Sequence, residues 1–362
     1  MSTEPKIRQL IQETGYITVD KMMKEVLSNN SSSYYRQLNL IGAGGDFTTA
    51  PEISQLFGEI IALWAIEQWY KLGCPVKTNL VELGPGRGRL LSDLLRVAKL
   101  VPEFYNSLSV ELVEINSHFK EWQKKNLSQF NLKIKWLNWV GDIAQVPLII
   151  IANEFFDALP IKQYIKIKEL WYEVIIIIDS KDNGIKFDKI ALTKELQQQF
   201  LNSYPSTEDG AIVEKSLEAM DTIKLISGHI KKYSGASLII DYGYDIAINH
   251  RTHSQYKSTL QALKNHQYHP LLVNLGEADL SAHVDFNSLK NVTQEAGIQT
   301  EGTILQRDFL INYGINLRSQ MLQKKLPLDK AQIIAKQADY LISPIKMGEL
   351  FKVLCLFNKS SM

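Results

Sequence analysis

Short apolar runs alternate along this chain with stretches whose apolar residues recur every three or four positions. The apolar runs predict buried strands, and the spacing of three and four predicts helices that each bury one face. The strands of the first two thirds are predicted at residues 80–83, 109–115, 133–137, 148–152 and 236–241. Strands that alternate with helices at these intervals indicate an α/β protein with a parallel, doubly wound sheet.

The final third of the chain continues the alternation. Its pattern predicts helices at about 286–296 and across 306–342, a strand near 298–304, and a last strand at 350–357. A last strand inserted beside its predecessor would complete a seven-stranded sheet. The pattern does not reveal strand order or register.

Three segments depart from this alternation. Residues 1–33 predict short helices, and residues 51–69 predict one helix that begins at Pro51. Residues 161–190 carry closely spaced β-branched runs around Asp182-Asn183-Gly184, a good hairpin turn, and therefore predict an antiparallel insertion. A helical stretch is predicted to follow over 193–232.

We accordingly expect three regions. They are a helical N-terminal region (1–75), a core in two pieces (76–160 and 233–362) and an inserted subdomain (161–232).

A glycine-rich turn follows the first predicted strand. Gly84, Gly86 and Gly88 stand at alternate positions just before a predicted helix. Glycine allows positive φ angles and lets backbone N–H groups approach a nucleotide-like ligand closely. Glu82 suits a positively charged ligand, and Arg89 stands where a dinucleotide-binding turn would carry a small residue. Both points favour S-adenosylmethionine over NAD, although a tight turn without a ligand stays an alternative.

Polar residues also follow the later strands of the predicted sheet. Glu114, Asp142 and Asn153 each come at or near a strand's carboxyl end, where ligands bind in open α/β sheets. We therefore expect these three residues, together with Glu82 and the glycines, to bind the cofactor. Glu114 is the candidate for both ribose hydroxyls.

The segment Asn153-Glu154-Phe155-Phe156-Asp157 places two acids three positions apart, directly after an apolar strand. Three roles compete for Glu154 and Asp157: caps for local backbone amides, a proton acceptor, or a clamp on a cationic substrate. A guanidinium is planar, forked and permanently charged, so a pair of carboxylates could hold it beside a methyl donor. The two acids are our candidates for catalytic residues.

Composition excludes several classes of function. The 362 residues carry a net charge of +1, so no overall charge points to nucleic acid or to an anionic membrane. No apolar run approaches the roughly 20 residues of a membrane span, and the N-terminus resembles no signal or transit peptide. Cys74 and Cys355 suggest a reducing compartment. We expect a cytoplasmic protein.

The histidines do not predict a metal site. His266 and His269, with His283 further along, match no zinc-binding spacing. His283 fits a substrate-binding loop or a hydrogen-bonded structural histidine better.

Five motifs in order closely resemble the MidA family, the group of the mitochondrial complex I assembly factor that acts as a protein arginine methyltransferase. They span Gly45–Ser54, Val81–Gly88, Ala152–Pro160, Ile239–Gly243 and Gly276–Phe286. The resemblance implies a Rossmann-like methyltransferase fold, S-adenosyl-L-methionine as cofactor, and methylation of an arginine on a protein such as a complex I subunit.

The resemblance also extends to single residues. It implies that the loop with Asp46, Thr48 and Glu52 closes over the cofactor, and that Asp142 lies near the adenine. This sequence departs from the expected pattern at Arg89 and Leu275, where Thr and Pro are expected. A cofactor-binding assembly chaperone and a small-molecule methyltransferase stay open as alternatives. A protein substrate is the expected partner, and a homodimer is considered.

Overall fold

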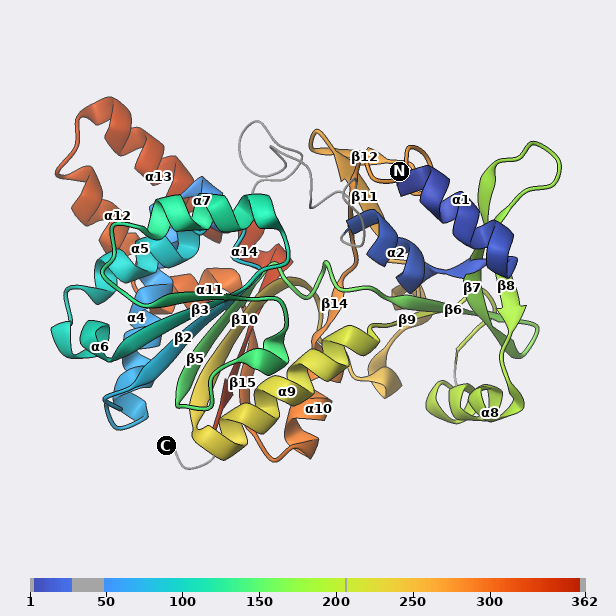
Figure 1. The fold of residues 1–362 in the computed structure, drawn as a ribbon, viewed down its shortest axis with the longest axis horizontal. Coiled ribbons are helices and arrows are strands. Elements are labelled where there is room, and N and C mark those ends of the chain that lie inside the picture. The colour runs from blue at the N-terminus through green and yellow to red at the C-terminus, as the bar shows by residue number, and fades with distance from the viewer. Residues whose placement is uncertain (1–2, 28–48, 206, 359–362) are drawn as a thin grey trace.

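The computed structural model describes residues 3–27, 49–205 and 207–358. A large sheet with helices on both faces occupies one half of the molecule, and a smaller, strongly bent β-region with its own helices occupies the other (Figure 1). The α/β class is therefore confirmed.

The large sheet has seven strands on its main path. In spatial order they are β15 (Gln299–Leu305), β16 (Phe351–Phe357), β10 (Gly235–Tyr244), β5 (Leu148–Asn153), β2 (Thr78–Leu83), β3 (Leu108–Val113) and β4 (Ile134–Leu137). The five strands from β10 to β4 are parallel, whereas β16 runs antiparallel to both of its neighbours. The last strand is thus inserted beside its predecessor. A two-residue strand, β14 (Val284–Asp285), also pairs with β10.

The order of these strands creates the place for a ligand. From β2 the chain moves outward through β3 to β4, and it then returns to the other side of β2 as β5. Connections therefore leave β2 and β5 in opposite directions, which opens a crevice at their carboxyl ends.

Two apolar cores hold helices to the two faces of this sheet. Alternate strand residues such as Leu80 and Ile149 face α4 (Gln55–Lys71) and α5 (Arg89–Ala98), whereas Val81 and Ile150 face the other side. That second side is covered by α9 (Leu217–Tyr233) and α10 (Phe286–Glu295). Each fully buried Leu or Ile contributes about 1.5–3 kcal/mol, so this alternation fixes which face each helix covers.

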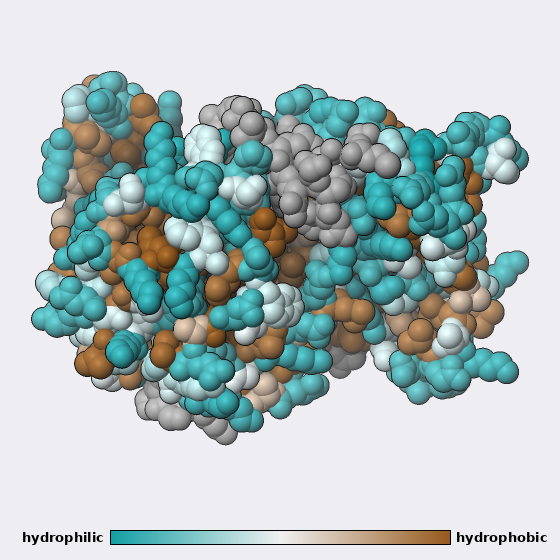
Figure 2. All heavy atoms as spheres, viewed as in Figure 1, coloured by the Kyte–Doolittle hydropathy of each residue, from teal (hydrophilic) through white to brown (hydrophobic). Residues whose placement is uncertain are grey.

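Further helices contribute buried residues to the first of these cores. They are α6 (Pro102–Ser107), α7 (Ser117–Leu127), α11 (Gln306–Asn312), α12 (Ile315–Gln323), α13 (Leu328–Ile342) and α14 (Met347–Leu350). Apolar residues gather on the surface over α12 and α13 (Figure 2), where Leu317 and Leu328 are exposed. Among the described residues, no helix is both long and apolar enough to cross a membrane.

The smaller β-region joins the N-terminal segment to the insertion. Its five-stranded sheet consists of β1 (Ile17–Thr18), β7 (Leu170–Ile178), β6 (Lys162–Ile167), β9 (Ile212–Lys215) and β8 (Ile185–Ala191). The predicted hairpin joins β7 to β8, and Asp182 Oδ1 accepts the Gly184 N–H at 2.8 Å in its turn. Helices α1 (Thr3–Thr14), α2 (Val19–Leu27) and α8 (Lys194–Ser203) pack around this sheet. A three-stranded sheet adjoins it, formed by β12 (Gln267–His269), β11 (Gln261–Lys264) and β13 (Asp279–Ser281).

Two predicted helices are wrong in their extent. The helix expected over 51–69 is broken at Ser54, which is extended and whose hydroxyl accepts the Leu56 N–H, so that α3 (Ala50–Ile53) ends before α4 begins. The helical stretch expected over 193–232 contains β9, a strand too short for apolar periodicity to reveal. The boundaries of the three regions stay a prediction, and α9 packs on the large sheet.

Gly243 and Gly228 provide a test of this packing. A Cβ on Gly243 in β10 would lie 2.1 Å from the Val284 carbonyl oxygen, whereas one on the exposed Gly228 in α9 would meet nothing within 4 Å. We expect Gly243→Ala to lower the free energy of unfolding by about 1–3 kcal/mol. Gly228→Ala should raise it by up to about 1 kcal/mol, since alanine favours helix. Equal effects in urea denaturation would contradict the pairing of β10 with β14.

Candidate active site

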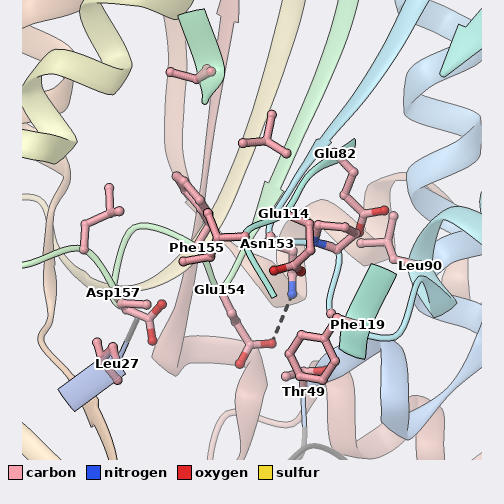
Figure 3. A pocket seen from close by; sticks show the side chains of 18 of the residues that line it. Leu27, Thr49, Glu82, Leu90, Glu114, Phe119, Asn153, Glu154, Phe155 and Asp157 are labelled. Atoms are coloured by element: carbon pink, nitrogen blue, oxygen red, sulfur yellow. Dashed lines mark hydrogen bonds between the residues drawn. The ribbon is translucent and has the colours of Figure 1, made fainter. Parts of the chain in front are cut away.

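A cavity of about 420 Å³ opens at the carboxyl ends of β2, β3 and β5. This volume suits a cofactor or small ligand. Glu82, Leu90 and Phe119 lie at one end of the cavity, and Leu27 and Asp157 lie at the other (Figure 3). Asn153 and Glu154 lie between the two ends.

The glycine turn forms the floor of the first end. Gly84, Gly86 and Gly88 have φ angles of +62°, +51° and +74°, which side-chain-bearing residues rarely adopt. A Cβ on Gly84 would lie 3.0 Å from the ring of Phe155. Gly84 and Gly86 line the cavity, whereas Gly88 lies behind the turn, where it starts α5.

One buried side chain, that of Gln123 in α7, ties the glycine turn to the acid at the end of β3. Its amide nitrogen donates to the Gly86 carbonyl oxygen at 2.7 Å and to Glu114 Oε2 at 3.3 Å. Its amide oxygen accepts the indole N–H of Trp136 at 2.8 Å. Gln123 is completely buried, so these bonds keep the turn and the acid at a constant separation.

Glu82 and Glu114 are buried acids at neighbouring strand ends. Burial, with repulsion from Glu114, raises the pKa of Glu82 to about 8. Burial likewise raises the pKa of Glu114 to about 7, although hydrogen bonds from Asn116 and Gln123 oppose the shift. Glu82 Oε2 is buried without a hydrogen-bond partner among the described residues. A buried carboxylate in this position calls for a cation or a donor from a ligand.

Glu154 leaves the end of β5 in a strained conformation. Its φ of +50° is uncommon for a residue with a side chain, and such strain concentrates at functional sites. Its backbone N–H still bonds to Ile240 in β10, at 2.9 Å, so the turn projects its side chain into the cavity. Oε1 accepts from the Ala50 N–H at 3.2 Å and from Asn153 Nδ2 at 3.1 Å.

The second oxygen of Glu154, Oε2, has no partner among the described residues. Burial, with repulsion from Asp157, raises the pKa of Glu154 to about 8.

Asp157 is held by hydrogen bonds to residues of β10. Its Oδ2 accepts the hydroxyl of Tyr242 at 2.7 Å, and its own N–H donates to the buried carboxylate of Asp241 at 3.2 Å. Burial raises the pKa of Asp157 to about 6 and that of Asp241 well above its ordinary value. Asp157 Oδ1 is buried and unpartnered within the described part of the chain.

The structure separates the predicted residues into two groups. The cavity is lined by Glu52, Glu82, Gly84, Gly86, Glu114, Asn153, Glu154 and Asp157. Three predicted residues do not line the cavity: Gly88, Asp142 and His283. Asp142 is exposed, although its neighbours Trp139 and Val140 line the cavity. His283 packs edge-on against Tyr242. Asp46 and Thr48 lie outside the described residues. The roles of all these residues stay predictions.

Several residues of the site carry no strong sequence signal. Gln123 looks like any helix residue, and Asp279, although it lies in the Gly276–Phe286 motif, reaches the cavity only through tertiary packing at the start of β13. Arg89 was noted above only as a departure from the expected sequence patterns. It lines the cavity and pairs at 2.8 Å with Glu52, whose side chain is buried. Among the described residues, no group of three or more His, Cys, Asp or Glu side chains is placed to hold a metal.

Fold and site together define the class. A doubly wound sheet, a glycine turn after β2 and acids at the carboxyl ends of β2 and β3 are the features of a methyltransferase fold with a nucleotide-like cofactor. Comparison with known proteins narrows this class. Residues 60–304 match a family model described as an S-adenosyl-L-methionine-dependent methyltransferase. The chain belongs to this family, which corresponds to the MidA group that its motifs resemble, and its cofactor is S-adenosyl-L-methionine.

Two curated relatives illustrate the family. The protein named "Protein arginine methyltransferase NDUFAF7, mitochondrial" from Danio rerio is 35% identical over 95% of this chain and 84% of its own length. The Homo sapiens protein of the same name is 33% identical over 97% of this chain and 83% of its own length.

A solved structure from Burkholderia thailandensis, bound to S-adenosyl-homocysteine, has the same fold. It is 24% identical, with a TM-score of 0.85 over 98% of this chain and 92% of its own.

The cavity residues fit this cofactor. Glu82 Oε2 and Asn153 Oδ1 are buried acceptors without partners in the described part of the chain. S-adenosyl-L-methionine carries positive charge, hydroxyl donors and an amine, which such acceptors require. When bound, it supplies an electrophilic methyl group.

We expect Glu82 to make cofactor binding dependent on pH. Its pKa of about 8 means that the free protein carries the proton at pH 7, and a cationic ligand favours the carboxylate. Cofactor affinity should therefore rise with pH up to about pH 8, by at most about tenfold per unit. Calorimetry in buffers of different ionisation enthalpy should show fewer protons released by Glu82→Gln than by the wild type. An equal number would contradict this assignment.

Gln123 should matter for cofactor affinity although it does not touch the cavity. We expect Gln123→Leu to weaken binding of S-adenosyl-homocysteine by about tenfold, since it removes one donor to Gly86 and Glu114. The exposed Gln129 in the segment after α7 provides the control, Gln129→Leu. Similar dissociation constants for both variants would show that the glycine turn does not depend on Gln123.

Proposed function

We propose that this protein methylates the side chain of an arginine in a protein substrate, such as a subunit of respiratory complex I, and thereby supports assembly of that complex. The observation that carries the proposal is the pair of carboxyl groups of Glu154 and Asp157. Each has one oxygen held by the protein and one without a partner among the described residues. The names of the relatives support the same reaction.

A guanidinium matches this pair in charge and shape. It carries five N–H donors in a rigid plane and keeps its charge when buried. Burial raises the pKa values of Glu154 and Asp157, and repulsion from Asp157 adds to the rise at Glu154. A bound guanidinium would lower both pKa values, so substrate binding would itself ionise the clamp.

The apolar part of the cavity suits the rest of an arginine side chain. Leu27 from α2 lines the cavity together with Leu159 and Pro160, which follow the acidic turn. Three methylene groups can lie against such a wall while the charged head reaches the carboxylates. A small, neutral substrate would need neither the pair of carboxyl groups nor this apolar wall.

The chain's own residues then act mainly by position. Glu154 and Asp157 would orient one guanidinium nitrogen toward the methyl group and exclude water. Positioning of this kind supplies much of the acceleration in such reactions. The methylated guanidinium must lose one proton as the reaction ends. Glu154, ionised by the bound guanidinium and in contact with it, would accept this proton and pass it to solvent.

The test is transfer of a tritiated methyl group to protein in a lysate of the source organism, with the modified residue located by mass spectrometry. We expect label on arginine from the wild type. Glu154→Gln and Asp157→Asn should each reduce the rate by at least about 100-fold, because each removes one charge-assisted bond in the transition state. Both variants should bind S-adenosyl-homocysteine within about threefold of the wild type, a difference below 1 kcal/mol.

A matched control is Glu121→Gln in α7, where the carboxylate is exposed and pairs only with Lys124 among the described residues. Its activity should equal that of the wild type. Undiminished transfer by both cavity variants would refute the clamp. Cofactor binding without transfer to any protein would instead favour an assembly chaperone, and label found only in small molecules would favour a small-molecule methyltransferase.

A further inference from the structure

Tyr242 lies near the carboxyl end of β10, behind a residue that lines the cavity, Asp157. Its side chain is buried, with 4% exposure, and does not line the cavity. The phenolic hydroxyl donates to Asp157 Oδ2 at 2.7 Å, and the Ser281 side chain also hydrogen-bonds Tyr242. A hydroxyl that accepts from serine directs its own proton toward the carboxylate.

We propose that Tyr242 is a positioning residue that turns Asp157 Oδ1 toward the substrate and keeps the Asp157 carboxyl group ionised. The proposal rests on the function proposed above. A carboxylate rotates freely about its last bond unless one oxygen is held. Here the hydroxyl of Tyr242 holds Oδ2, and Oδ1 is left buried without a partner in the described part of the chain.

The residue beside Tyr242 holds the backbone of the same turn. Asp241 is completely buried, and its Oδ2 accepts the N–H groups of Phe156 at 3.0 Å and of Asp157 at 3.2 Å. Two consecutive residues of β10 thus hold the acidic turn with their side chains: Asp241 accepts from the main chain of the turn, and Tyr242 donates to the Asp157 carboxylate. Because β10 is an interior strand of the sheet, paired with β5 and β16, this support is rigid.

The charged surroundings explain why Asp157 needs a donor. Repulsion from Asp157 raises the pKa values of Glu154 and Asp241, and Asp279 adds to the negative charge around Glu154. His283 packs edge-on against the Tyr242 ring, and burial, with the charge of Lys352, lowers the pKa of His283. The Tyr242 hydroxyl is the largest influence that opposes the rise in the pKa of Asp157 caused by burial.

Tyr242→Phe removes the donor and keeps the ring. The ring packs edge-on against His283 and Phe351, with centroid distances of 5.5 Å and 5.6 Å, so its packing should survive. Loss of the hydrogen bond should raise the pKa of Asp157 above about 6. The ionised form is then present only at higher pH, so the acid limb of kcat/KM should move to higher pH.

A rise of about one pKa unit from about 6 should lower kcat/KM roughly twofold at pH 7 and roughly tenfold near pH 5, with activity recovered at pH 8.5. Binding of S-adenosyl-homocysteine should stay within about twofold, because Tyr242 lies away from the cofactor end. The control is Tyr268→Phe, since Tyr268 is 82% exposed in β12. An unchanged pH profile and rate for Tyr242→Phe would overturn the inference.

Carboxyl NMR distinguishes this failure from failure of the proposed function. Specific labelling gives the pKa of Asp157 in the wild type and in Tyr242→Phe without any substrate. A raised pKa in the variant supports the inference even if the wild type methylates no arginine, which would refute the proposed function alone. Equal pKa values in both proteins would refute the role of Tyr242, whatever reaction the wild type performs.

Discussion

Carboxyl groups buried at one edge of a parallel sheet are the constraint on which the site depends. Glu82, Glu114, Glu154 and Asp157 all lie where strands β2, β3 and β5 end, and burial raises the pKa of each. Burying an ionised acid without a partner costs several kcal/mol, so the free protein holds part of this set protonated. A cationic ligand relieves the cost, which links binding of cofactor and substrate to the release of protons.

Among the described residues, neutral groups donate the hydrogen bonds that these acids accept. Gln123 reaches Glu114 from α7, Ala50 reaches Glu154 from the start of α3, and Tyr242 reaches Asp157 from β10. A lysine or arginine in such a position would neutralise an acid and compete with a cationic ligand. Neutral donors hold each carboxyl group in one orientation and leave its charge available. The net charge of +1 for the whole chain conceals this local concentration of acids.

Much of the architecture could be predicted from the sequence because it depends on local signals. The apolar runs of β2 and β5, the glycine turn and the Asp182–Gly184 hairpin each occupy a few consecutive residues. Strand periodicity and turn chemistry are properties of such windows. The break at Ser54 and the strand β9 could not be predicted, because one hydrogen bond to a serine and pairing with a distant strand decided them.

The sequence alone determined the class of fold, the glycine turn and the two acids after β5, since these depend on composition and spacing within short segments. Only the tertiary structure decided which polar residues support them. Gln123, Asp241 and Tyr242 lie 37, 84 and 85 positions from the groups that they hold. Their partners are set by strand order and helix packing, and no local pattern encodes a contact across the sheet. Asp142 and His283 show the converse. Both were expected at the site from the sequence, yet packing places neither in the cavity wall.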